Sequence, residues 1–337
     1  MLGLINARRL LVGARGLGLA SVVVMMMFAF GVSSAMAVPG GEFAVFAQCP
    51  LSVANLNGCI VGRTESGEVR VGNESIPVVT EQTLQGGFTE NEVTEALTFV
   101  GAANGETLTR APDPVPGGLF GLVRCNEIKG RGWRVRVARR VCKDVVRHGA
   151  SDVNASTELA GSASSIGLNE GNLLSESGTA ISLPVKVKLE NPLLGNECYI
   201  GSDTSPITLN LTTGTTSPNP PNTPITGKLG QVSVSPEGTI LTLNNNTLVD
   251  NTFSAPEATG CGGVFSSVID PLLNAKFGLP AASGENTAIF TGPHEQAGAR
   301  LVREHETTTT TPPPPPPPPP PPSGHRKHRW DGEASSR

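Results

Sequence analysis

Alternation of apolar and polar residues predicts two β-strands in the middle of the chain. In Ile181–Glu190 every second residue, from Ile181 to Leu189, is apolar, and the residues between them are polar or proline. Successive side chains of a strand point to opposite faces, so this pattern places five apolar side chains on one buried face. Ile207–Leu211 repeats the alternation. Pro184 cannot donate a hydrogen bond to a ladder, so we predict that its strand lies at a sheet edge or contains a bulge.

Shorter patterns predict further elements. Arg70–Val79 and Gly230–Val249 each contain strand residues on both sides of a turn. Asn286–Thr291 is predicted to be the last strand. A short helix, Pro271–Phe277, is predicted after Asp270, because aspartate suits the N-cap and proline suits the first helical position.

Composition favours β-structure over helix. Glycine supplies 40 of the 337 residues, aromatic residues only 4% and charged residues only 16%. Such a mixture is typical of short strands with tight turns around a core of aliphatic side chains. We predict a mainly β fold, with one large or two smaller antiparallel β-sandwich-like domains and short helical insertions. These occupy residues 38–306, between an N-terminal signal helix (1–37) and a disordered tail (307–337).

The first 37 residues are typical of a secretory signal. Three arginines precede the apolar run Val22–Phe30, and Ala35–Ala37 supplies the small residues of a cleavage site. We predict cleavage before Val38 and a secreted or cell-surface location. Two alternatives remain. The Arg8-Arg9 pair could belong to a twin-arginine signal, and the uncharged stretch Gly16–Gly41 is long enough to be an uncleaved membrane anchor.

Export changes the interpretation of the cysteines. An even number in an oxidising compartment predicts disulfides, and six cysteines allow 15 pairings. We predict that neighbours along the chain pair. No C-x-x-C motif accompanies the cysteines, so we predict no metal site and no cofactor. The six are Cys49, Cys59, Cys125, Cys142, Cys198 and Cys261.

A basic excursion, residues 124–149, interrupts an acidic region. Residues 124–147 hold nine basic and two acidic residues, whereas the rest of residues 38–306 holds nine basic and 25 acidic residues. Helical spacing places Val135, Ala138, Cys142 and Val145 on one face. The opposite face carries a basic patch that could bind anionic cell-wall polymers or acidic lipids, or could simply be solvated. Its residues are Arg136, Arg140, Lys143 and Arg147.

The acidic balance of the remaining region argues against nucleic acid as a partner. A membrane is expected as a partner only if the N-terminal segment stays attached. After residue 306, a threonine run leads to eleven prolines, Pro312–Pro322, and then to a basic tip, His325–Arg329. Such a tail suits electrostatic adhesion to an anionic wall, or no specific contact at all.

No catalytic motif is apparent. A hydrolase usually needs a histidine base, and before His305 the exported region offers only His148 and His294. We place His294, in the sequence GPHEQ, in a surface turn. There is no G-x-S-x-G elbow, and among 27 acidic residues of the exported region no pair stands out. We therefore predict no catalytic residue, and a protein that is more readily a binding or structural protein than an enzyme.

Three segments carry a resemblance. LPVKVKLENPLLGNECYIGS, the later TTGTTSP and LVDNTFSAPEATGCGG at Leu248–Gly263 resemble a group of secreted proteins from actinomycete-type bacteria. The resemblance covers roughly Val38–Ala299 and implies export and a shared fold, but no activity.

Two functions therefore stay open. The first is an exported, disulfide-stabilised β-rich protein that builds or binds the cell envelope. The second is a secreted hydrolase without a recognisable catalytic motif. A deep polar pocket that gathers acidic side chains or histidine would favour the hydrolase, and a convex sandwich with short loops would favour the structural protein.

Overall fold

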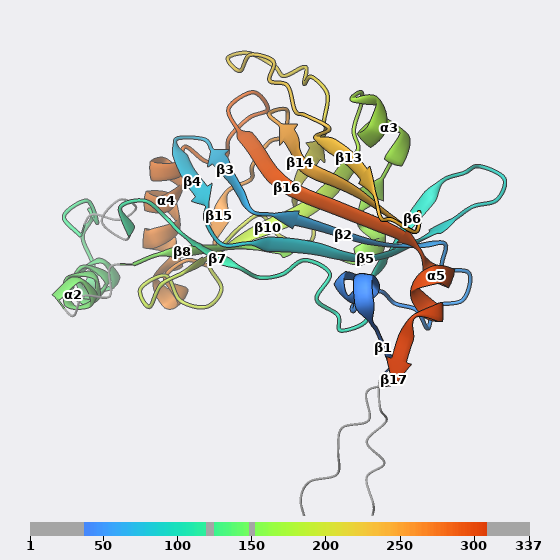
Figure 1. The fold of residues 1–337 in the computed structure, drawn as a ribbon. Coiled ribbons are helices and arrows are strands. Elements are labelled where there is room, and N and C mark those ends of the chain that lie inside the picture. The colour runs from blue at the N-terminus through green and yellow to red at the C-terminus, as the bar shows by residue number, and fades with distance from the viewer. Residues whose placement is uncertain (1–36, 119–124, 148–151, 309–337) are drawn as a thin grey trace, which may run out of the picture. The chain divides into compact units, whose positions relative to one another are not determined.

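Two antiparallel sheets form most of the computed structural model, which describes residues 37–118, 125–147 and 152–308 (Figure 1). Residues 1–36 of the predicted signal, His148 and the proline run Pro312–Pro322 lie outside these residues. The described residues belong to one compact unit. Within them the structure is mainly β with few short helices, as the sequence predicts.

The large sheet has eight strands among the described residues. Its order is β13-β14-β16-β2-β5-β6, and β3 pairs with both β16 and β4. The strands are β2 (Gly58–Thr64), β3 (Ser66–Val71), β4 (Glu74–Val78), β5 (Gln82–Glu90), β6 (Leu97–Gly101), β13 (Gln231–Val234), β14 (Ile240–Asp250) and β16 (Thr287–Gly298).

The small sheet has seven strands within the described part of the chain. Its order is β15-β11-β10-β8-β7, and β9 and β12 also pair with β10. The strands are β7 (Pro112–Pro114), β8 (Asn154–Leu159), β9 (Gly167–Leu168), β10 (Ile181–Glu190), β11 (Tyr199–Ile200), β12 (Ile207–Leu211) and β15 (Ala258–Thr259).

Strand β10 carries the predicted alternation and buries all five of its apolar residues from Ile181 to Leu189. The prediction of an edge strand is wrong, because β10 has neighbours on both sides: β12 and β11 on one, β9 and β8 on the other. In an antiparallel strand the N–H and C=O of one residue point to the same neighbouring strand. The N–H that Pro184 lacks would therefore point only to one side of β10. The Pro184 carbonyl accepts from the Ala160 N–H at 2.9 Å, on the side where pairing passes from β9 to β8.

The predicted helices both exist, but one begins earlier than expected. The described residues contain four α-helices, and α2 lies within the predicted basic excursion, residues 124–149. Helix α4 starts at Ser266, so Asp270 is not its N-cap and Pro271 lies inside it. The Asp270 carboxylate instead accepts from the backbone N–H of Cys261 at 2.7 Å, which ties down the preceding turn. The helices are α2 (Trp133–Arg147), α3 (Glu170–Ser175), α4 (Ser266–Phe277) and α5 (Ala299–Glu304).

Strand β16 is longer than the predicted Asn286–Thr291 and runs on to Gly298. The sequence GPHEQ therefore belongs to a strand between β14 and β2, and the placement of His294 in a surface turn is wrong. Both predicted turn regions, in Arg70–Val79 and Gly230–Val249, do join paired strands, β3 with β4 and β13 with β14.

The core consists of two apolar clusters. The larger is built from the facing sides of the two sheets, with β10 contributing to it throughout, together with Ala138 and Cys142 of α2. The smaller lies around Cys59 and Val61, whose side chains alternate with that of Ile60 in the larger cluster. Strand β2 is therefore buried on both faces, since α5 and the 3₁₀ helix η1 (Gly41–Phe46) contribute to the smaller cluster.

Three disulfides join the cysteines as sequence order predicts: Cys49–Cys59, Cys125–Cys142 and Cys198–Cys261. The last closes the longest loop, with a sequence separation of 63 residues. No cysteine of the described residues is therefore free.

The ends of the described chain lie side by side. Strand β1 (Ala37–Pro39) pairs with β17 (Glu306–Thr308) (Figure 1). Strand β17 therefore includes Thr307 and Thr308, the first two residues of the predicted tail. A cut before Val38 would leave two of the three β1 residues in place to pair with β17.

A buried carboxylate links the sheets. Asp113 of β7 accepts hydrogen bonds from the backbone N–H of Val79 at 2.9 Å and of Thr80 at 2.8 Å. The Gln82 side-chain amide donates to its second oxygen at 2.8 Å. Asp113 thus holds the β4–β5 connection of the large sheet against the small sheet.

Candidate functional site

Helix α2 is fastened to the body through its apolar face. Ala138 and Cys142 are buried in the larger cluster, and Val135 is partly buried against it. The Cys125–Cys142 disulfide and a 2.5 Å hydrogen bond from the Arg139 guanidinium to the Ile128 carbonyl tie the helix to the segment before it. The predicted apolar face is therefore the buried one, and the side chain of Val145 lies outside the described set.

The other face of α2 displays positive charge. Arg136, Arg140 and Lys143 of the predicted basic patch are exposed, and none of the three forms an ion pair with another described residue. The side chain of Arg147 is not described. Trp133 at the start of the helix is 63% exposed, with the Arg134 guanidinium 5.6 Å from its ring centre. The sequence thus located a surface that is both basic and rigidly held.

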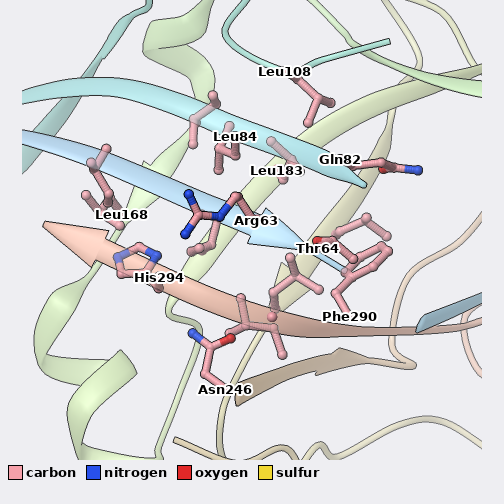
Figure 2. A pocket seen from close by; sticks show the side chains of 18 of the residues that line it. Arg63, Thr64, Gln82, Leu84, Leu108, Leu168, Leu183, Asn246, Phe290 and His294 are labelled. Carbon is pink, nitrogen blue, oxygen red and sulfur yellow. The ribbon is translucent and has the colours of Figure 1, made fainter. Parts of the chain in front are cut away.

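A second candidate site, which the sequence did not indicate, is a cavity between the two sheets (Figure 2). Its volume is about 80 Å³. Strands β2, β5, β6, β14 and β16 form one wall, and β8, β9, β10 and β12 form the other. The lining is mostly aliphatic and aromatic, with residues such as Leu84, Leu168, Leu183 and Phe290.

His294 of β16 lies in this cavity and is only 5% exposed. Its register partner on β2 is Gly62, and a Cβ atom there would lie 3.4 Å from His294 Nδ1. The other ring nitrogen, Nε2, is buried without a hydrogen-bond partner among the described residues. Burial lowers the pKa of His294 from its usual 6.5 to about 4, because desolvation disfavours the imidazolium. The ring is therefore neutral at neutral pH.

Asn246 of β14 lies beside His294, on the neighbouring strand (Figure 2). It is 4% exposed, and its side-chain Nδ2 has no hydrogen-bond partner in the described part of the chain. A β-bulge places it there: β14 has one extra residue between Leu243, opposite His294, and Asn246, opposite Gly292. The extra residue reverses the alternation, so that Leu243 and Asn246 both face the cavity side. Asn245 accommodates the bulge with a φ of 54°.

Two unpaired polar groups in an apolar cavity carry a cost. A buried donor without a partner destabilises a protein by about 1–3 kcal/mol. Most buried polar groups of native proteins are paired, so each exception calls for an explanation such as a ligand or an ordered water. The cavity thus brings together two buried polar atoms, Asn246 Nδ2 and His294 Nε2, that have no partner among the described residues.

Charge in the cavity is neutralised. Arg63 also lines it, but its guanidinium pairs with Glu295 at 2.7 Å. The lining contains no carboxylate. A separate polar cleft lies outside the cavity, bordered by Arg110 and Glu158, which are 3.6 Å apart. Leu108 lines both spaces and separates the apolar cavity from this cleft.

The sequence analysis did not identify His294 or Asn246 as candidate site residues. His294 was visible as one of two histidines in the region, but alternation around Gly292 and Pro293 is too weak to define a strand. The run Asn244–Asn246 was the available signal for Asn246, because asparagine tolerates the left-handed conformation that bulges use.

Two searches of the described residues were negative. No group of three or more histidine, cysteine, aspartate or glutamate side chains is arranged to hold a metal ion there. No helix in the same ranges is long and apolar enough to cross a membrane.

Comparison with protein-family models, with curated proteins and with solved structures gave no match. The resemblance to secreted actinomycete proteins therefore stays a prediction.

Proposed function

We propose that this chain is an exported binding protein of the cell envelope, which attaches to anionic envelope polymers through helix α2. The observation that carries the proposal is the exposed basic face of a helix whose opposite face is buried and disulfide-bonded. The three disulfides within a β-rich body support an oxidising location, since such bonds persist outside the reducing cytosol.

The spacing of the charges suits a polyanion. Arg136 and Arg140 are four residues apart and Lys143 follows three later, so the three side chains lie along one face of the helix. Arginine forms forked hydrogen bonds with phosphate, and lysine contributes a mobile point charge. A polymer with a phosphate in every repeat could contact several of these cations together. Because the helix is fastened at both Ala138 and Cys142, little conformational entropy is lost when the polymer binds.

The test compares two charge variants of equal net charge. One carries Arg136→Gln, Arg140→Gln and Lys143→Gln. The matched control removes three other exposed cations: Arg110→Gln, Lys228→Gln and Arg300→Gln. Both are measured, beside the unaltered mature protein, for binding to immobilised poly(glycerol phosphate) at rising salt concentration.

We expect the α2 variant to bind at least about tenfold more weakly and to lose most of the salt dependence, since exposed charges are screened within about 10 Å at 0.1 M salt. The control should bind within about twofold of the unaltered protein. Equal weakening of both variants would mean that only total charge matters. Absence of binding by the unaltered protein would refute the proposal outright.

A further inference from the structure

We infer that the cavity between the sheets is a binding site for a small neutral molecule with an apolar body and one oxygen-bearing group, such as a short-chain alcohol or ketone, which hydrogen-bonds to Asn246 and His294. This site lies between the sheets rather than on α2, and the inference does not depend on the proposed function.

The unpaired polar atoms define the chemistry of the group that binds. Asn246 Nδ2 is a donor, so its missing partner is an acceptor oxygen. His294 Nε2 is unpaired too, and in a neutral imidazole this nitrogen either donates or accepts according to the tautomer. A ketone oxygen can accept from both side chains. An alcohol can accept from Asn246 and donate to His294.

The two side chains are close enough to share one group. Asn246 lies opposite Gly292, and His294 lies two residues further along the same strand on the same face. Diagonal neighbours of this kind are about 7–8 Å apart at the backbone, and their side chains can converge on one atom. Figure 2 shows both residues at the cavity, on adjacent strands.

The rest of the cavity defines the body of the ligand. Leucine, isoleucine and phenylalanine side chains from both sheets form most of the lining, so the remainder of the molecule is apolar. The lining offers no free charge, because Arg63 is paired with Glu295 and no acidic residue is present. A carboxylate or an amine would therefore lose its hydration without gaining a counter-ion.

The volume limits the size. The cavity of about 80 Å³ is smaller than the ~150 Å³ engineered cavity that holds benzene, which points to a molecule of roughly four or five non-hydrogen atoms. Leu108 borders both the cavity and the polar cleft beside Arg110.

The experiment uses three probes of similar size, 2-butanone, n-pentane and butyrate, with the mature disulfide-bonded protein at pH 7. Binding is followed by NMR through the side-chain amide signals of Asn246 and the ring signals of His294. We expect saturable shifts with 2-butanone, affinity for n-pentane about tenfold weaker because it forms no hydrogen bond, and no binding of butyrate.

Two variants distinguish a site that binds through hydrogen bonds from a cavity that takes up any apolar molecule. Asn246→Leu should remove the tenfold preference for 2-butanone over n-pentane, and Lys228→Gln, on the surface, should keep it. If Asn246→Leu does not fold, Leu209→Phe serves instead, because the added ring atoms fill the cavity and should abolish binding of both neutral probes.

A crystal structure of the protein soaked in 2-butanone completes the test. Density for the ketone between Asn246 and His294 would support the inference. Ordered water at this position that the ketone does not displace, equal binding of n-pentane and 2-butanone, or unchanged binding by Leu209→Phe would each overturn it.

Discussion

Burial of His294 predicts a specific dependence of stability on pH. The pKa of this side chain falls from 6.5 to about 4 on folding. Between these values the unfolded chain binds a proton that the folded protein does not bind. The contribution of neutral His294 to the free energy of unfolding is therefore complete above pH 6.5 and is lost as the pH falls toward 4. The difference of about 2.5 pKa units corresponds to a loss of about 3 kcal/mol between pH 7 and pH 4, at 1.36 kcal/mol per unit.

The substitution His294→Leu isolates this contribution. Carboxylates also titrate in this range, so the quantity to compare at each pH is the difference in free energy of unfolding between His294→Leu and the unaltered protein. At pH 7 we expect the variant to be as stable as the unaltered protein or more stable, because it no longer buries an unpaired nitrogen. By pH 4 its advantage should have grown by about 3 kcal/mol.

Guanidinium chloride unfolding at half-unit steps from pH 7 to pH 4 measures the difference, with disulfides intact in both proteins. Arg63 is the only other ionisable residue of the cavity lining. Two stability curves that run parallel over the whole range would show that His294 titrates normally. The assignment of a buried, neutral imidazole would then be refuted.

Three further predictions concern the framework. Replacing both cysteines of Cys198–Cys261 by alanine should cost about 4 kcal/mol in chemical unfolding, against about 3 kcal/mol for Cys49–Cys59. The difference is expected because Cys198–Cys261 closes a loop of 63 residues and Cys49–Cys59 a loop of 10. A larger cost for Cys49–Cys59 would contradict this explanation. Asp113→Ala should cost about 3 kcal/mol by leaving two backbone N–H groups unpaired, whereas Asp113→Asn, which keeps an acceptor oxygen, should cost less than half as much in the same assay. The exported protein should begin at Val38, and N-terminal sequencing that finds Met1 on a membrane-bound form would show an uncleaved anchor instead.

The pattern of apolar and polar residues was sufficient to predict features that depend only on residues close together in the sequence. Alternation in β10 located its buried face, and helical spacing located the buried face of α2. Cysteine order was also informative, since each disulfide joins two cysteines that are neighbours along the chain. The two buried faces follow from backbone periodicity, which any segment carries within itself.

Only the tertiary structure decided which strands are neighbours and how they are aligned. Pro184 occupies a central strand because its missing N–H falls where pairing passes from β9 to β8, a juxtaposition of distant segments. Asn246 faces the cavity because one extra residue in β14 reverses the alternation relative to β16. His294 is neutral and unpaired because the opposite sheet covers it with apolar side chains. Periodicity shows that a strand has a buried face, but what lies across that face depends on the partner, and there the candidate ligand site arises.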